Sequence, residues 1–156
     1  MIDFELKSIK FFEAGSQETP CFTAEIYENG KRVAYVNNDG HGGSSNVHPA
    51  SGLKYADISK YDDSDVECEI FERVYMDGVI RKNQNKGLLF EEQGDVKIIS
   101  FNKSISQLKK TPKGMEALRR EIKLLREEGL EVINRNLKGV EDHKHPIPSY
   151  SELSRR

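Results

Sequence analysis

Alternation of apolar and polar residues predicts a β-hairpin near the start of the chain. Apolar side chains recur over 21–27 and 31–36, and Asn29-Gly30 between them favours a two-residue type I′ turn. Such a turn pairs Ile26 with Val33. The face expected to look into the core then carries Phe22, Ala24, Ile26, Val33 and Tyr35, and the solvent face carries Thr23, Glu25, Tyr27 and Arg32.

Two other regions also have strand character. Residues 3–12 alternate and then change phase, which predicts an edge strand with a bulge. The segments 87–92 and 95–101 flank Gln93-Gly94 and predict a second hairpin. The apolar side chains expected to face each other in it are Leu88, Phe90, Val96 and Ile98.

Helical spacing predicts a first helix in the middle of the chain. Ser64 and Glu67 have the spacing of a capping box, and Gly78 is placed to end the helix. A strand over 68–75 is the competing interpretation, because this segment is rich in β-branched and aromatic residues. The preceding segment 53–61 fits either a strand or a short helix.

A second helix, strongly amphipathic, is predicted over 112–128. Thr111 is a good N-cap, Pro112 tolerates the first helical position, and Gly129 suits a left-handed C-cap. We expect its apolar stripe to pack against the first or the second hairpin. The stripe consists of Met115, Leu118, Ile122 and Leu125.

These elements predict an α+β fold in a single domain over 1–138. We expect an antiparallel sheet with the long amphipathic helix on one face and one or two shorter helices, such as the turn opened by Ser104 and Gln107. Residues 130–133 are a candidate closing strand. From 139 to 156 apolar residues are few, which predicts a loosely ordered tail.

Composition indicates a globular protein of a reducing compartment. Of 156 residues, 36% are hydrophobic, which is enough for one ordinary core. Cys21 and Cys68 lie in apolar-periodic stretches and are expected to be buried free thiols. The start of the sequence has no export signal, and no run approaches the roughly 20 apolar residues that cross a bilayer. We therefore expect a cytoplasmic protein without membrane contact.

Charge is distributed unevenly although the net charge is only −2. Residues 1–100 have an excess of acidic side chains, and residues 101–156 have an excess of basic ones. A basic end can contact nucleic acid. Glutamates interrupt the basic side of the 112–128 helix, however, so a solvated helix face is the simpler interpretation.

Chemically useful residues are concentrated in the glycine-rich segment 37–49, which we expect to be a loop throughout. Its glycines free the backbone to turn N–H groups toward one point, as an anion site requires. The candidate ligand-binding residues are Asn38, Asp39, Gly40, His41, Gly42, Gly43, Ser44 and His48. No known phosphate-loop spacing is present, so a structural connection is the simpler interpretation.

Metal binding and catalysis have weaker support. His41 and His48 share the segment with Asp39, and two more histidines stand at 143 and 145, but their spacing matches no zinc motif. Ser44 is near His48 without the strand-turn-helix setting of a nucleophile. We expect no metal, no cofactor and no catalytic residue, and a non-enzymatic protein is favoured.

The stretch Phe22 to Gly43 reads F-x-A-x-I-Y-x-x-G-K-x-V-x-x-V-x-N-D-G-x-G-G, and it resembles a pattern of short uncharacterised bacterial and bacteriophage proteins. The resemblance brings no established activity. It implies a small accessory protein of a phage or mobile element, which binds a host factor or antagonises host defence in a bacterial or infected host cell.

The leading hypothesis is therefore a non-enzymatic protein that acts through a protein partner. The alternative is an anion or nucleotide site, or a hydrolase, built on 37–49, in which Gly42 and Gly43 hold an anion and His41 or His48 moves a proton. Nucleic-acid binding is a third, less favoured class. The oligomeric state is left open.

Overall fold

The computed structural model describes residues 2–140, and the fold is α+β as expected. Contacts divide the chain between Gly78 and Val79 into two compact units. Each unit has its own hydrophobic cluster and its own antiparallel sheet, of four and two strands. Whether the two units unfold together, as a single domain over 1–138 requires, stays a prediction.

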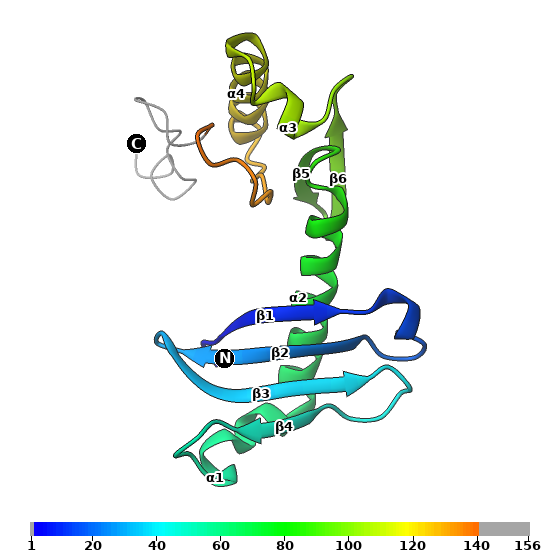
Figure 1. Ribbon diagram of the computed structural model, residues 1–156, viewed down its shortest axis with the longest axis vertical. Helices are drawn as coiled ribbons and strands as arrows, with labels where there is room; N and C mark the ends of the chain where they lie inside the picture. Colours follow the sequence, from blue (N-terminus) through cyan, green and yellow to red (C-terminus); the bar gives the residue numbers. More distant parts are fainter. Residues whose placement is uncertain (1, 141–156) are drawn as a thin grey trace. The chain divides into compact units, whose positions relative to one another are not determined.

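The first unit is a four-stranded sheet with a helix on one face. The strands lie in the order β1 (Glu5–Phe11), β2 (Cys21–Glu28), β3 (Lys31–Asp39) and β4 (Asn46–Pro49). Figure 1 shows helix α2 (Ser64–Asn83) passing behind them. Three short helical turns complete the elements of this unit: η1 (Glu13–Gly15), α1 (Tyr55–Ile58) and η2 (Ser59–Asp62). Of the segment 53–61, residues 55–61 are therefore helical.

The expected turn at Asn29-Gly30 is confirmed, but the hairpin contains a bulge that the sequence did not indicate. Asn29 and Gly30 have φ angles of 51° and 80°, as a type I′ turn requires. The register then shifts, and Ile26 pairs with Ala34 instead of Val33. Because one extra residue reverses the facing of those that follow, Tyr35 is exposed and its predicted place on the core face was wrong, whereas Val33 packs against the core as expected. The buried residues of that strand are Ala34, Val36 and Asn38.

Strand β1 is an edge strand with a bulge, as predicted. Its register with β2 shifts between Lys7 and Lys10, and Ser8 adopts a positive φ of 53°. The shift restores apolar side chains to the inner face, where Phe11 pairs with Phe22 across the strands. Both phases of the sequence pattern therefore face the same core.

Helix α2 covers the inner face of the sheet, which excludes the strand interpretation of 68–75. Asp63, not Ser64, caps it, because its Oδ1 accepts from the N–H groups of Asp65 (2.9 Å) and Val66 (3.2 Å). The helix also continues past Gly78. A Cβ there would lie 2.7 Å from Cδ1 of Phe11, so the glycine permits close packing on β1 instead of ending the helix.

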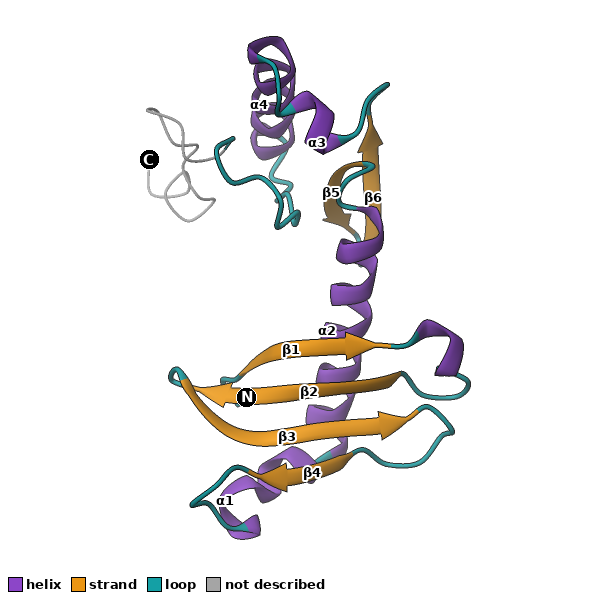
Figure 2. Cartoon of the chain, viewed as in Figure 1, coloured by secondary structure: helices purple, strands orange, loops and turns teal. Residues whose placement is uncertain are grey.

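The second unit contains the other hairpin, β5 (Gly87–Glu92) and β6 (Asp95–Ser100), with helices α3 (Ile105–Leu108) and α4 (Pro112–Glu127), as Figure 2 shows. The two-residue turn at Gln93-Gly94 pairs Leu88 with Ile99 and Phe90 with Lys97. The expected facing of these residues with Val96 and Ile98 was therefore wrong, because those two lie on the opposite face.

Helix α4 has the predicted caps and the predicted buried stripe. Thr111 Oγ1 accepts from the N–H of Gly114 at 3.0 Å, and the N–H of Leu130 returns to the carbonyl of Leu125 at 2.9 Å beyond Gly129. The stripe packs against the second hairpin, one of the two expected alternatives. The apolar residues of this cluster include Leu88, Phe90, Ile105, Leu118, Ile122 and Leu125.

The segment after α4 differs from expectation in two places. The closing strand at 130–133 is reduced to a single bridge between Val132 and Phe90. Gly139 and Val140 do not belong to a loose tail, because Val140 is buried and Arg119 donates to the carbonyl oxygens of both residues. The remainder of the expected tail, 141–156, lies outside the described residues.

The cysteines are free, but the prediction that both are buried was wrong. Cys68 is exposed on α2, and Cys21 is partly buried. Among residues 2–140, no helix combines the length and apolar character needed to cross a bilayer.

Candidate functional site

The glycine-rich segment is a β-hairpin with a short loop, which corrects the expectation of a loop over 37–49. Strand β3 extends to Asp39, and β4 begins at Asn46 and pairs with β3 through Asn37↔Asn46 and Val36↔Val47. Only the residues between Asp39 and Asn46 lie outside the ladder. Polar strand ends at Asn37 and Asn38 concealed the pairing, since their composition is typical of turns.

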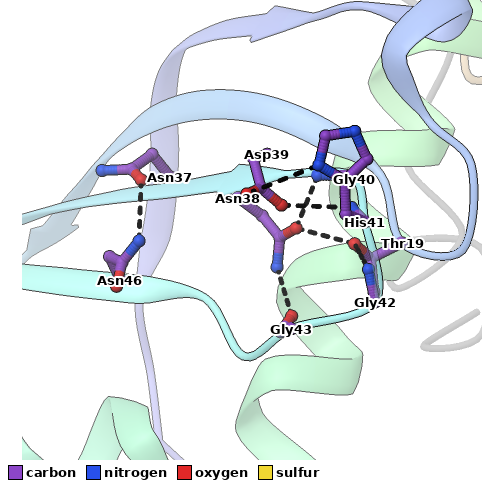
Figure 3. A network of polar contacts seen from close by, with 9 residues as sticks. All are labelled: Thr19, Asn37, Asn38, Asp39, Gly40, His41, Gly42, Gly43 and Asn46. Carbon is purple, nitrogen blue, oxygen red and sulfur yellow. Dashed lines mark hydrogen bonds and ion pairs between the residues drawn. The ribbon is translucent and has the colours of Figure 1, made fainter.

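Asn38 is the organising residue of this hairpin (Figure 3). Its side chain is only 4% exposed, and all of its polar atoms are used. Oδ1 accepts from Thr19 Oγ1 at 2.7 Å and from the N–H of Gly40 at 2.9 Å. Nδ2 donates to the carbonyl of Gly43 at 2.9 Å and to Ser45 Oγ at 3.2 Å. One buried amide thus joins both ends of the loop to the β1–β2 connection.

The backbone of Gly40 is held by the same connection. Its carbonyl oxygen accepts N–H bonds from residues 17 and 18, both at 3.0 Å, and from Thr19 at 3.4 Å. Gly40 has a φ of 87°, and a Cβ there would overlap the carbonyl oxygen of Gly15. Only glycine fits this position, so its role is steric and structural.

The loop has few backbone N–H groups left to bind an anion. The N–H of Gly42 donates to Thr19 Oγ1 at 3.3 Å, and the N–H of Ser45 donates to the carboxylate of Glu67 at 2.6 Å. A Cβ on Gly42 would overlap the carboxylate of Glu18, which therefore lies beside this glycine. Acidic groups close to these N–H groups disfavour a second negative charge.

The histidines and Ser44 are placed on exposed surface. His41 Nδ1 lies 3.6 Å from Asp39 Oδ2, and both side chains are largely exposed. His48 belongs to β4 and pairs with Tyr35 of β3, away from the loop. In the part of the chain from 2 to 140, no group of three or more His, Cys, Asp or Glu side chains is arranged to hold a metal. Residues 143 and 145 lie outside the described residues.

A cavity of about 450 Å³ adjoins the start of α2 in the first unit. Two of its acidic residues already have structural partners, because Asp63 caps α2 and Glu69 bonds Arg73 at 2.7 Å. The lining residues are Ile2, Lys60, Asp63, Asp65, Val66 and Glu69. The set contains no Ser, Thr, Cys or His side chain, and the ammonium group of Lys60 is paired with Glu28 at 2.5 Å.

The sheet face opposite α2, which we term the outer sheet face, carries a continuous set of polar and aromatic side chains. The ladder register places Lys7, Glu25, Tyr35 and His48 in one row across the four strands. By the alternation of the strands, the outer sheet face consists of Glu5, Lys7, Lys10, Thr23, Glu25, Tyr27, Arg32, Tyr35, Asn37, Asn46 and His48.

Cations and tyrosines are paired on this face. Lys7 Nζ lies 4.5 Å from the ring centre of Tyr27, and Arg32 Cζ lies 4.9 Å from that of Tyr35. Glu25 stands between them and accepts from the Tyr27 hydroxyl (3.3 Å) and from Arg32 (3.4 Å). The sequence predicted Thr23, Glu25, Tyr27 and Arg32 here, but it missed Tyr35 and His48. The bulge beside Val33 and the unrecognised β4 carried no clear sequence signal.

No family model matches the chain, and neither a curated protein nor a solved structure matches it. The roles of the residues must therefore be argued from their geometry. In the glycine-rich hairpin, the polar groups of Asn38 are hydrogen-bonded within the protein. The outer sheet face, by contrast, presents the exposed aromatic side chain of Tyr35.

Proposed function

We propose that this chain is a small, non-enzymatic accessory protein that binds a protein partner through the outer sheet face. The observation that carries the proposal is the row of tyrosine and cationic side chains on a sheet face that α2 leaves uncovered. Tyrosine and arginine are the residues most enriched in the energetically dominant parts of protein interfaces. Tyr35 is 38% exposed and can lose much further surface on binding.

Preorganisation supports this role. Arg32 holds the Tyr35 ring and Glu25 holds the Tyr27 hydroxyl before a partner arrives, and Arg32 and Glu25 are bonded to each other across the strands. Rigid side chains lose little rotamer entropy when they bind, which favours affinity. The antiparallel ladder beneath them, with its bulge beside Val33, fixes their spacing.

The balance of charge favours protein over nucleic acid. The basic side chains Lys7, Lys10 and Arg32 are matched by acidic side chains on the same face or at its rim: Glu5, Glu25 and Asp39. A nucleic-acid surface is strongly basic. The basic groups Lys109 and Arg119 of the second unit donate to main-chain carbonyl oxygens instead.

The setting in a phage or mobile element is part of this proposal and is supported by the sequence resemblance alone. An anion or nucleotide site, or a hydrolase, on 37–49 is the weaker alternative, because Thr19 and Glu18 occupy the surroundings of Gly42. Thermal-shift screening with nucleotides and phosphates tests that alternative directly.

The proposal is tested by affinity capture from a bacterial extract, followed by reconstitution of the complex from purified components. Tyr35→Ala should weaken the reconstituted complex by roughly thirtyfold, the effect of losing one interface anchor of about 2 kcal/mol. Tyr55→Ala is the matched control, because Tyr55 is 61% exposed and lies on α1, outside the outer sheet face.

Equal affinities of the two variants would refute binding through this face. Failure to reconstitute any complex, together with turnover in a general activity screen, would refute the non-enzymatic function itself. Circular dichroism of both variants establishes that a loss of binding does not reflect a loss of fold.

A further inference from the structure

Within residues 2–140, the two sheets have three edges that no other strand pairs with, and two of them are protected against strand addition. The edge strand β1 is interrupted by a bulge at Ser8, and the edge strand β4 has four residues and ends at Pro49. Bulges, short length and proline are the usual means of preventing edge-to-edge pairing. Neither edge offers a regular backbone ladder.

The third edge, β6, has neither a bulge nor a proline, and its one lysine, Lys97, is paired with Glu92. Its six residues pair with β5 without a register shift, and it contains neither proline nor glycine. The far side of β5 is occupied, because Val132 bridges to Phe90 and the N–H of Ile133 donates to Leu89. Among residues 2–140, no strand pairs with the outer edge of β6. Ile98 on this strand is 41% exposed.

The backbone groups on this edge can be assigned from the register. Glu92 and Asp95 flank a two-residue turn, so they form the hydrogen-bonded pair that closes the hairpin. Alternate residues beyond that pair direct their N–H and C=O groups away from β5. The outward groups therefore belong to Val96, Ile98 and Ser100.

We propose that β6 pairs with β6 of a second copy of this chain, in an antiparallel ladder with Ile98 on the two-fold axis. A two-fold axis at Ile98 places Val96 opposite Ser100 of the other copy and satisfies all three outward residues. It joins the two hairpins into one four-stranded sheet across the dimer. Antiparallel pairing of one segment with itself is the isologous contact of a two-fold dimer.

The exposed Ile98 and the absence of opposed like charges support this occupant and this register. Lys97 faces Ile99 of the second copy, Asp95 faces Phe101, and no like charges stand directly opposite. Glu92 of the same chain bonds Lys97 at 2.5 Å and neutralises its charge. The Lys97 side chains of the two copies, one residue from the axis, therefore repel each other little. The exposed Ile98 side chains meet each other at the centre, which removes apolar surface from water.

The test is sedimentation velocity of the full chain over a wide range of concentrations. The wild type should dimerise reversibly. Ile98→Lys should raise the dissociation constant roughly tenfold or more, because it places two ammonium groups opposite each other at the axis. Leu124→Lys is the matched control, since Leu124 is 47% exposed on α4 and lies outside the edge. It should leave the dimer unchanged.

Amide hydrogen exchange of the wild type provides a second readout that needs no variant. The amides of Val96 and Ile98 should exchange slowly in concentrated protein and rapidly after dilution. The amides of Lys97 and Ile99 point toward β5 and should stay protected in both conditions. A monomer at every concentration, a dimer that survives Ile98→Lys, or Val96 and Ile98 exchange that is independent of concentration would overturn the proposal.

Discussion

At the scale of single residues, Asn38 determines how the glycine-rich segment is built. Its buried amide uses both Oδ1 and Nδ2 within the protein, on partners from the β1–β2 connection and from both ends of the loop. A residue type that suggests ligand binding in a sequence therefore acts as a structural crosslink. The remaining ionisable groups of the same segment are at exposed positions, where their interactions contribute little to the stability of the fold.

Asn38→Ala should lower the free energy of unfolding by about 3 kcal/mol, because it leaves the N–H of Gly40 and the carbonyl of Gly43 without their partner. Urea denaturation measures the change. Asn37→Ala is the control, since Asn37 makes one exposed bond of 3.3 Å to Asn46, and it should cost less than about 1 kcal/mol. Equal costs for the two variants would show that Asn38 is not the crosslink.

Tyr61 gives the fold a dependence on alkaline pH. The residue is buried in the first core against Phe4, and burial, then the Glu28 carboxylate, raises the pKa of its hydroxyl well above the ordinary value of 10.0. The unfolded chain therefore releases this proton at a lower pH than the folded chain. Stability that is fully present below the unfolded pKa should be lost as the pH rises above it.

Tyr61→Phe should flatten this alkaline loss, because it keeps the ring and removes the ionisable hydroxyl. The measurement is the urea midpoint at several pH values between 8 and about 11, bracketing the ordinary tyrosine pKa. Tyr35→Phe, at an exposed position, should retain the slope of the wild type. An unchanged slope in Tyr61→Phe would contradict the assignment.

At the scale of elements, the sequence predicted correctly those turns and helix ends that depend only on a few neighbouring residues. The turns at Asn29-Gly30 and Gln93-Gly94 and the caps of α4 follow from conformational preferences of a few neighbouring residues. The bulge beside Val33 does not, because it is chosen by packing against α2, which is distant in sequence. This one residue determined which side chains became the outer sheet face.

Glycines show the same division between local and tertiary causes. Gly129 caps α4 through its own positive φ of 80°, which the sequence predicted. Gly78 and Gly114 lie inside helices, and each is required by a neighbour that packs against it. Gly78 was predicted to end the helix because a helix interior disfavours glycine unless a neighbour approaches it closely. The contacts of the candidate ligand residues Asn38 and Gly42 could not be predicted for a similar reason, since their partner Thr19 comes from another element.

Gly114→Ala should destabilise the second unit by about 2 kcal/mol, although alanine favours a helix by about 1 kcal/mol. The added Cβ would overlap the carbonyl oxygen of Leu108, and this backbone atom cannot rotate away. Gly43→Ala is the control, because a Cβ there meets nothing within 4 Å. Thermal melting followed by circular dichroism should show a lower midpoint for Gly114→Ala alone, and similar midpoints would contradict the close approach of α3 and α4.

At the scale of the whole molecule, two compact units with separate cores lie along one chain. The boundary falls inside α2, so neither unit ends at a flexible linker. We expect one cooperative transition in calorimetry, with calorimetric and van't Hoff enthalpies that agree, as a single domain over 1–138 requires. Two resolved transitions would instead establish two domains.

In the proposed function, the glycine-rich hairpin is structural and the outer sheet face binds the partner. Titration calorimetry of the captured and purified partner with Tyr35→Ala and His41→Ala tests this division most directly. Both substitutions are at exposed positions, so both variants should fold. We predict wild-type affinity for His41→Ala and roughly thirtyfold weaker binding for Tyr35→Ala. Weakened binding by His41→Ala with wild-type affinity for Tyr35→Ala would contradict it.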